Sequence, residues 1–526
     1  MWRSLFWSFC GLIVLFGSTW TATSTYYTAG VVEFRLRVSG ASSAQLLDEH
    51  LEAYLALIRS PEANETDIIV FPEGTLNSVL QLTAVPAPGS FNNSLCNGAQ
   101  IDEQVAPFLR QLACAAQETS TYLVINVKER EACETGDPCS SNGYNVFNTN
   151  VVFDRNGTVI SRYRKWNLYL EPMTNQTAAP ELATFQTDFG VTFGHIICFD
   201  MLFYTPAQDL IEKLDVRDVI VTKMFNSELP FLTASQLQQG WAWGNNVNLL
   251  AAGASYPQAG ISGSGIYAGQ QGALVRRMVG DSDEGVRELL VARVPFWPTP
   301  AEAVDVPRPL PAQRRLLLLQ QPRLEDFNTQ LLEPHNGSSS YRLCQQDLCC
   351  EFQLNTTIVA NNIESSYHYR LGVFVGQRTY EEARYSVVRL CGLFACHNAS
   401  LESCGQLHDE VEGEAPSTYL QFSELSIRGE FVQRERRLLM PSTLSSSLYA
   451  LQASEMDWQL EECKDSAKTL VEMRLLQLQS ELLTFGIYGN YFDERSAAKS
   501  QNLSVAMLLL SGLMLWSSCS WLGLGF

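Results

Sequence analysis

Histidine and basic side chains are scarce in this chain. Its 526 residues include six His and 36 Lys and Arg, against 56 Asp and Glu, which gives a formal net charge of −20. Such a charge repels the phosphates of nucleic acids and the headgroups of anionic lipids. We therefore expect no nucleic-acid partner and no peripheral attachment to an anionic membrane. The apolar content of 46% is typical of a packed globular protein.

Several catalytic signatures are also missing. The sequence contains no G-x-S-x-G elbow, no H-E-x-x-H and no Walker loop. Cys–His catalysis is disfavoured, because His195 stands three positions before Cys198 and would point to the opposite face of a strand. The glycine-rich segment 260–269 lacks the Lys of a phosphate-binding loop. We expect it to be a loop between strands that lines a pocket.

Long apolar runs stand at the two ends of the chain. Residues 1–23 carry one Arg before an apolar stretch and then small polar residues, the pattern of a cleaved signal peptide; a signal anchor is the alternative. Residues 496–526 begin with small residues and finish in an uncharged apolar tail, the pattern of a removed GPI-attachment signal. With no basic residue beyond the tail, a retained transmembrane helix is the weaker alternative.

These two signals predict a route and a location. We expect passage through the secretory pathway and attachment to the outer leaflet of the plasma membrane through a lipid on Ser496, with a secreted protein as the alternative. Glycosylation is expected on the same route. Seven asparagines begin Asn-X-Ser/Thr without Pro at X: Asn64, Asn92, Asn156, Asn175, Asn336, Asn355 and Asn398.

The chain has 14 cysteines, of which Cys10 and Cys519 fall in the segments expected to be removed. If Cys198 is free, eleven remain, so either one more thiol is unpaired or Cys198 is not a nucleophile. Six cysteines between positions 344 and 404 read as a disulfide framework of open connectivity. A zinc site that uses Cys396 and His397 is the alternative there.

The organisation changes along the chain. Up to about residue 300, strand-like runs rich in Val and Ile alternate with helix-like runs, which predicts an α/β domain over residues 24–300. Prolines then mark a linker at residues 301–312. Residues 313–495 contain strand-like runs and the cysteine cluster, and we expect a smaller β-rich domain there.

Three polar residues end predicted strands of the α/β domain: Glu73, Lys165 and Cys198. Ligands bind at the carboxyl ends of parallel strands, so the three could share one pocket. There a carboxylate would act as general base, an ammonium would stabilise an oxyanion and a thiol would attack an amide carbonyl. Taken singly, each has a plainer interpretation: a loop carboxylate, a solvated basic patch and a core thiol.

Three blocks in this order resemble the catalytic blocks of the carbon–nitrogen hydrolase (nitrilase) superfamily. They are "FPEG" at Phe71–Gly74, "YRKWNLY" at Tyr163–Tyr169 and "ICFDMLFYTPA" at Ile197–Ala207. Within that superfamily the chain is similar to the vanin and biotinidase branch, which "NLLAAGASYP" and "GSGIYA" also resemble. The resemblance covers nearly the whole mature chain.

The resemblance implies a four-layer α-β-β-α sandwich followed by a β-rich base domain. It implies Glu73 as general base and acid, Lys165 as oxyanion stabiliser, Cys198 as nucleophile, and the backbone N–H of Phe199 as a second oxyanion donor. It implies neither a metal nor an organic cofactor. Vanins cleave pantetheine to pantothenate and cysteamine, and biotinidase cleaves biotin amides such as biocytin. The predicted lipid anchor favours the vanin side.

Some positions depart from the family pattern. We expect Lys223 and Met224 to contact the substrate. Vanins carry a small residue and Trp in this segment, so the departure leaves the identity of the substrate open. Glu171 is a candidate supporting carboxylate. The leading hypothesis is therefore an extracellular hydrolase of linear amides, with a small-molecule amide as its partner. Its rivals are a catalytically silent surface protein that binds a small ligand, and an interaction module in the C-terminal domain. The sequence leaves the oligomeric state open.

Overall fold

The computed structural model describes residues 25–89, 94–97, 103–134, 139–280, 282–297, 316–359, 366–381, 384–408, 420–463 and 467–492. The expected signal peptide, the proline-rich linker, the C-terminal signal with Ser496, and Asn92 lie outside these ranges. Within the described residues, no helix is long and apolar enough to cross a membrane.

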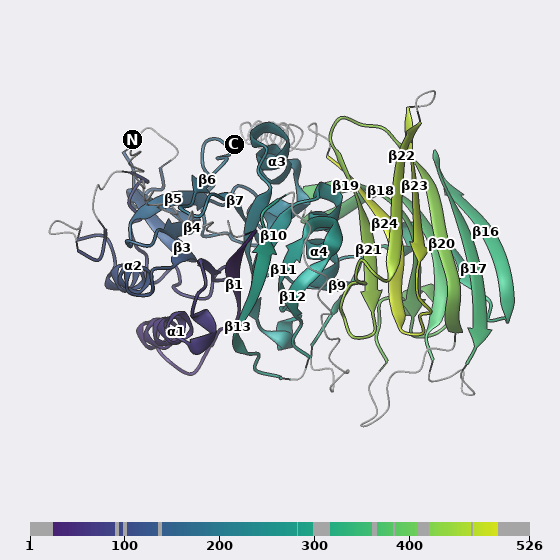
Figure 1. The fold of residues 1–526 in the computed structure, drawn as a ribbon, viewed down its shortest axis with the longest axis horizontal. Helices are drawn as coiled ribbons and strands as arrows, with labels where there is room; N and C mark the ends of the chain where they lie inside the picture. Colours follow the sequence, from purple (N-terminus) through teal and green to yellow (C-terminus); the bar gives the residue numbers. More distant parts are fainter. Residues whose placement is uncertain are drawn as a thin grey trace, which may run out of the picture.

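A twelve-stranded sheet forms the N-terminal part of the molecule (Figure 1). Its path runs β5-β4-β3-β2-β1-β10-β8-β7-β6, and β11, β12 and β13 attach along β10, β11 and β1. The bounds are β1 Tyr26–Arg35, β2 Ile68–Val70, β3 Tyr122–Ala132, β4 Tyr144–Phe153, β5 Val159–Arg164, β6 Thr184–Gln186, β7 Thr192–Ile197, β8 Asp218–Lys223, β10 Asn248–Ser255, β11 Ser264–Ala268, β12 Ala273–Arg277 and β13 Arg287–Pro295.

The two ends of this path face each other. Asn150 on β4 donates a hydrogen bond from its side chain to the carbonyl of Ile196 on β7, 3.2 Å away. The Asn150 side chain also accepts one from Thr222 on β8 at 2.7 Å. Alternate residues of the strands, such as Val70 and Ile220, fill an apolar layer between the facing strands.

Helices cover the outer faces of the two β layers. On one side lie α1 (Ser43–Ile58) and α2 (Pro107–Thr119), whose apolar faces pack on alternate residues of β1, β2 and β3. The Ser42 and Gln45 side chains cap the start of α1 in a capping box. The other face carries α3 (Asp209–Leu214) and α4 (Ala234–Asn245). This arrangement confirms the predicted four-layer α-β-β-α sandwich.

The C-terminal part is a sandwich of two five-stranded antiparallel sheets, which we call the base domain (residues 328–491). One sheet has the order β15-β18-β19-β24-β21 and the other β16-β17-β20-β23-β22. Their bounds are β15 Asn328–Leu332, β16 Gly337–Gln345, β17 Leu348–Ile358, β18 His368–Glu381, β19 Arg384–Cys396, β20 Leu420–Val432, β21 Arg437–Ser445, β22 Met456–Cys463, β23 Lys468–Leu475 and β24 Leu482–Tyr491. A short two-stranded sheet pairs β9 (Glu228–Leu229) with β14 (Leu319–Gln320) and joins the two parts.

Helix α4 lies between the two parts and packs against β21 (Figure 1). A Cβ atom placed on Gly240 would come within 2.5 Å of the Pro441 carbonyl oxygen, so only glycine permits this close approach. One apolar cluster runs without a break from α4 into both sheets of the base domain. The two parts therefore share a core instead of touching through a polar surface.

Five disulfides pair ten cysteines, and the cysteine cluster of the base domain is the predicted disulfide framework. The bonds are Cys96–Cys114, Cys133–Cys139, Cys344–Cys349, Cys350–Cys391 and Cys396–Cys404. The zinc alternative is wrong, because the sulfur of Cys396 is bonded to Cys404. Cys198 is the free cysteine among the side chains that the structure describes. The side chain of Cys463, the remaining cysteine of the count, is outside them.

Candidate active site

The three predicted residues meet at one edge of the sheet. Lys165 directly follows β5 and Cys198 directly follows β7, while Glu73 stands three residues after β2. Strand β4 is antiparallel to both β3 and β5, so β5 runs in the same direction as the parallel strands β2 and β3. Strand β7 also runs in this direction, because parallel pairs join it through β8, β10 and β1 to β2. The carboxyl ends of β2, β5 and β7 therefore face the same edge, where α/β sheets bind ligands.

A buried ion-pair network surrounds Lys165. Its Nζ atom lies 2.7 Å from Oε1 of Glu73 and 2.7 Å from Oε1 of Glu171. Lys128 pairs with the other oxygen of Glu171 at 2.7 Å. The side-chain amide of Asn148 donates to Glu73 at 2.7 Å and to Glu171 at 2.8 Å. Glu171, expected only as a supporting carboxylate, thus belongs to the same network as Glu73 and Lys165.

The backbone of Met224 connects this network to the thiol. The Met224 N–H donates to Oε2 of Glu73 at 3.0 Å, and the Met224 carbonyl accepts from Sγ of Cys198 at 3.6 Å. One residue after β8 therefore touches both the carboxylate and the sulfur. Glu73, which pairs with Lys165, and Cys198 therefore both contact the backbone of this residue.

Cys198 begins a tight turn, Cys198–Leu202, which we call the nucleophile turn. Its φ of 47° lies in the left-handed region, which is unfavourable for a residue other than glycine. Asp200 supports the turn from inside, since its carboxylate accepts from the Ile197 N–H at 3.0 Å and from Tyr163 Oη at 2.7 Å. Burial raises the pKa of Asp200 to about 6, although the hydrogen bonds from Asn167, Tyr163 and Ile197 oppose the rise. Strand β7 ends at Ile197, which leaves the thiol on the turn.

Burial and charge together set the protonation states. Burial, joined by the charge of Glu73, raises the pKa of the Cys198 thiol, and Lys165 only partly opposes this effect. For Lys165, burial opposes the charged form, but Glu73 and Glu171 outweigh it and hold its pKa above the usual value. Burial of Glu171 is likewise outweighed by Lys165 and Lys128, which lower its pKa to about 2. The resting site therefore holds a neutral thiol beside a charged ammonium.

Lys223 occupies a lateral row with two other residues. Glu33 on β1, Gly253 on β10 and Lys223 on β8 are direct partners across the sheet, so their side-chain positions share one face. A Cβ atom on Gly253 would lie 2.6 Å from Nζ of Lys223, so the missing side chain makes room for the amine. Burial lowers the pKa of Lys223, and the charges of Glu33, Cys198 and Glu73 oppose the change.

Glu33 is the buried carboxylate of this row. It accepts from Ser262 Oγ at 2.7 Å and from Ser264 Oγ at 2.5 Å. Both serines come from the glycine-rich segment 260–269, which was expected to be a loop. This expectation is wrong for its second half, because Ser264–Ala268 form β11. Strand β11 pairs antiparallel with β10.

Three further residues are placed as follows. His195 is fully buried on β7 and bonds Ser161 at 2.8 Å, and burial lowers its pKa to about 3. His195 therefore makes a structural hydrogen bond in the interior of the sandwich. Phe199 directly follows the thiol, and its ring packs on Tyr169 with centroids 4.7 Å apart. The side chain of Met224 extends toward Gly74, where a Cβ atom would lie 3.1 Å from its methyl group.

Asn148 and Lys128 are site residues that the sequence reasoning missed. Asn126, Asn148 and Asn150 are buried on β3 and β4, among apolar neighbours. Asparagines at inward positions of otherwise apolar strands were the signal that could have pointed to them, because buried amides need partners. Lys128 carried no such signal, since only the pairing of β3 with β4 brings it to Glu171.

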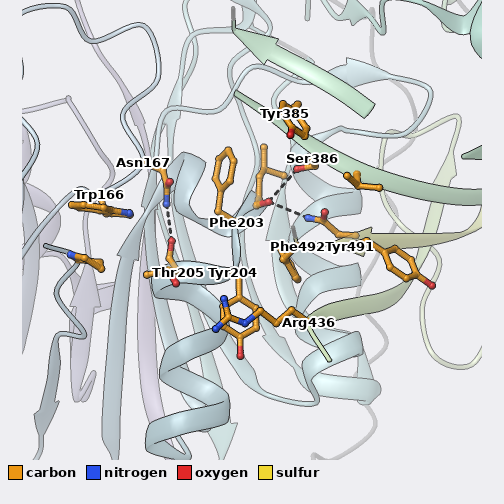
Figure 2. Close-up of a pocket in the computed structure, with 14 residues that line it drawn as sticks. Trp166, Asn167, Phe203, Tyr204, Thr205, Tyr385, Ser386, Arg436, Tyr491 and Phe492 are labelled. Atoms are coloured by element: carbon orange, nitrogen blue, oxygen red, sulfur yellow. Dashed lines mark hydrogen bonds between the residues drawn. The ribbon is translucent and has the colours of Figure 1, made fainter. Parts of the chain in front are cut away.

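A cavity of about 340 Å³ lies between the sandwich and the base domain. Trp166, Phe203 and Tyr204 line one side, and Tyr385, Arg436 and Phe492 line the other (Figure 2). Trp166 follows Lys165 directly, and Phe203 follows the nucleophile turn. The cavity therefore adjoins segments that carry two of the three predicted residues, although none of the three lines it.

Of the six asparagines of glycosylation motifs that the structure describes, four are exposed: Asn64, Asn156, Asn336 and Asn398. Asn175 and Asn355 are partly buried, and Asn175 accepts a hydrogen bond from the Val146 N–H at 2.8 Å.

Comparison with known proteins adds two family matches. Residues 35–229 match the family Carbon-nitrogen hydrolase, and residues 316–495 match the Vanin C-terminal domain. Vanin-like protein 3 of Drosophila melanogaster is 57% identical over 92% of this chain and 92% of its own length. Biotinidase of Takifugu rubripes is 30% identical over 89% of this chain and 95% of its own. Pantetheinase of Homo sapiens is 30% identical over 75% of this chain and 76% of its own.

Proposed function

Because the chain belongs to the vanin and biotinidase branch of the nitrilase superfamily, we propose that it hydrolyses pantetheine to pantothenate and cysteamine at the cell surface. The coarser activity, hydrolysis of a non-peptide carbon–nitrogen bond, comes with the family. The observation that supports amide hydrolysis through a thiol is the contact of Met224 with both Glu73 and the Cys198 thiol, beside an ammonium held by two carboxylates.

The proposed reaction proceeds through a thioester. Glu73 takes the proton of the neutral Cys198 thiol as sulfur bonds to the amide carbon. Lys165 and the backbone N–H of Phe199 stabilise the oxyanion of the tetrahedral intermediate. The carbon–nitrogen bond then breaks, and Glu73 returns its proton to the departing amine. A water molecule that Glu73 deprotonates attacks the thioester, and the released sulfur recovers the proton.

The network around Lys165 supports these roles. Glu73 and Glu171 hold Lys165 in its charged form, and this ammonium can stabilise the negative charge that develops on oxygen. Since Lys165 remains charged, it needs no reorganisation when that charge appears, and such preorganised groups lower the barrier most. Asn148 keeps Glu73 and Glu171 in fixed positions while the proton moves.

The experiment compares purified ectodomain with two variants. We expect the wild type to release pantothenate from pantetheine, measured by mass spectrometry. Cys198→Ala should abolish release, and Glu73→Gln should lower kcat by about 10²–10⁴-fold, the usual contribution of a general base. Glu131→Gln is the control carboxylate: it lies on β3 and pairs with Arg164, and should keep wild-type activity. A folded wild type that releases no pantothenate would refute the proposal.

Biotin-amide hydrolysis is the second candidate, because biotinidases match the chain over nearly its whole length. Biocytin assayed in parallel separates the two, and the substrate with the higher kcat/KM decides between them. If neither is cleaved although Cys198 is intact, a silent ligand-binding protein becomes the better account. We propose that Lys223 and Met224 contact the acyl group of the substrate and so determine which acyl group is accepted.

The proposed location follows the sequence signals. Residues 1–23 and 496–526 would be removed, leaving a hydrolase domain (24–300), a linker (301–312) and the base domain region (313–495), with a lipid on Ser496. Release of the protein from cells by a phosphatidylinositol-specific phospholipase would support the anchor. Full retention in the membrane fraction after that treatment would contradict it.

A further inference from the structure

Two hydrogen bonds from the base domain reach one carbonyl group of the nucleophile turn. The carbonyl oxygen of Leu202, the last residue of the turn, accepts a hydrogen bond from Nδ2 of Asn490 at 3.0 Å. It also accepts one from Oγ of Ser386 at 3.3 Å. Figure 2 shows both bonds as dashed lines in the wall of the cavity. The donors come from neighbouring strands, β24 and β19, and both side chains are almost fully buried.

A second contact reaches the other end of the same turn. The ring of Phe199, the residue after the thiol, packs edge-on against Tyr380 with centroids 5.3 Å apart. Tyr380 in turn donates a hydrogen bond to Ser386 at 3.2 Å. One side of the turn thus rests on three connected base-domain residues. On the other side, Asp200 ties the turn to the sandwich, because its carboxylate accepts hydrogen bonds from the Ile197 N–H and from Tyr163 Oη.

The turn needs such support for two physical reasons. Cys198 has a positive φ, a conformation that is unfavourable in a non-glycine residue and persists only where the surroundings hold it. A buried carbonyl that loses its donors also costs free energy, so the Leu202 oxygen favours the backbone position at which both donors reach it. Movement at Leu202 would pass through the five-residue turn to the sulfur of Cys198 and the N–H of Phe199.

We propose that Asn490 and Ser386 are positioning residues for the nucleophile, so that the base domain sets the reactivity of Cys198 as well as bracing the fold. The inference deepens the proposed amidase function and rests on it for the kinetic readout. Neither residue touches substrate in this account. Each acts through the Leu202 carbonyl, and a shift of the sulfur by about 1 Å is enough to lower a rate by up to about 10²-fold.

The test compares Asn490→Leu and Ser386→Ala with a matched control. Thr484 lies on β24 as Asn490 does, and its hydroxyl donates to the Pro230 carbonyl at 2.7 Å across the same interface. Thr484→Val therefore removes a buried inter-domain hydrogen bond that does not reach the turn. Ser386→Thr keeps a hydroxyl and serves as the conservative variant. Three quantities are measured: the rate of Cys198 alkylation by iodoacetamide, and kcat and KM for amide hydrolysis.

We expect Asn490→Leu and Ser386→Ala to lower kcat and the alkylation rate by about 10-fold or more, with KM within about 2-fold of wild type. Thr484→Val should change the melting temperature but neither rate, and Ser386→Thr should retain most of both. Equal rates in Ser386→Ala, Thr484→Val and wild type would overturn the proposal. If Asn490→Leu does not fold, the smaller Ser386→Ala variant still decides.

The alkylation rate keeps this inference separate from the proposed function. A wild type that alkylates normally but hydrolyses no amide refutes the amidase proposal, while unequal alkylation among the variants still supports positioning. An active wild type with variants that match the control refutes positioning and leaves the amidase proposal in place.

Discussion

At the scale of single residues, Gly253 decides where the amine of Lys223 lies. A Cβ atom at position 253 would come within 2.6 Å of Nζ and 3.1 Å of Ser264 Oγ. Gly253→Ala should therefore destabilise the fold by about 1–3 kcal/mol, the usual cost of overpacking. Lys223→Ala removes the nearer atom, so the double variant should lose less than the sum of the two single losses.

Chemical denaturation of the wild type, both single variants and the double variant measures this coupling. An interaction energy of about 0.5 kcal/mol or more would be expected for residues in contact. Strictly additive losses would show that the amine does not occupy the space above Gly253. Assays of the same variants on pantetheine and biocytin would show whether Lys223 also contributes to substrate specificity.

Glu171 links stability to pH. Lys165 and Lys128 outweigh its burial and lower its pKa from the ordinary 4.5 to about 2 in the folded protein. A folded-state pKa below the unfolded value means that the stabilisation is complete above about pH 4.5 and is lost as the pH falls toward 2. Glu171→Gln should be less stable than wild type at neutral pH and should lose less stability across this window.

Urea unfolding at a series of pH values between 7 and 3 tests the dependence on Glu171. The free energies of unfolding of the two proteins should converge as the pH falls. Parallel curves would show that the carboxylate gains nothing from its two lysines.

At the scale of elements, disulfides join strands in two different ways. Cys350–Cys391 connects β17 of one base-domain sheet to β19 of the other, and the two cysteines are 41 positions apart in the sequence. Cys344–Cys349 joins the neighbouring strands β16 and β17, and its cysteines are 5 positions apart. The chain-entropy estimate gives a loss of about 4 kcal/mol for removing the first and about 2 kcal/mol for the second. Pairwise replacement by Ala, followed by thermal unfolding, should rank the two in this order.

The strands and helices themselves were largely predictable. Runs such as Ile68–Val70 and Val219–Val221 are buried on both faces, and their unbroken apolar character indicated strands covered by helices. The helix that became α1 showed apolar residues at helical spacing. The prediction for segment 260–269 failed because its glycines suggested a loop. The strand Ser264–Ala268 in this segment depends on pairing with β10, which local sequence does not encode.

At the scale of the whole molecule, α4 holds the sandwich to the base domain. Ala in place of Gly240 would gain about 1 kcal/mol of helix propensity, but its Cβ would meet the Pro441 carbonyl at 2.5 Å. The clash, at about 1–3 kcal/mol, should win because the obstacle is backbone and cannot rotate away. Gly240→Ala should therefore lower the melting temperature and increase proteolysis between the two parts.

Gly280→Ala is the control for that variant, because a Cβ atom there meets nothing within 4 Å. It should be neutral or stabilising by less than about 1 kcal/mol. If the two variants melted together, the close approach of α4 to β21 would carry no energetic weight.

By itself the sequence determined the three blocks that hold Glu73, Lys165 and Cys198, the α/β order of the first half and the disulfide-rich β character of the second. These are local properties, since residue type, periodicity and spacing act over a few neighbouring positions. The tertiary structure decided the partners: Asn148 between two carboxylates, Met224 between the Glu73 carboxylate and the thiol, and Asn490 with Ser386 on the nucleophile turn. The segments that make those contacts are brought together only by strand order and domain packing.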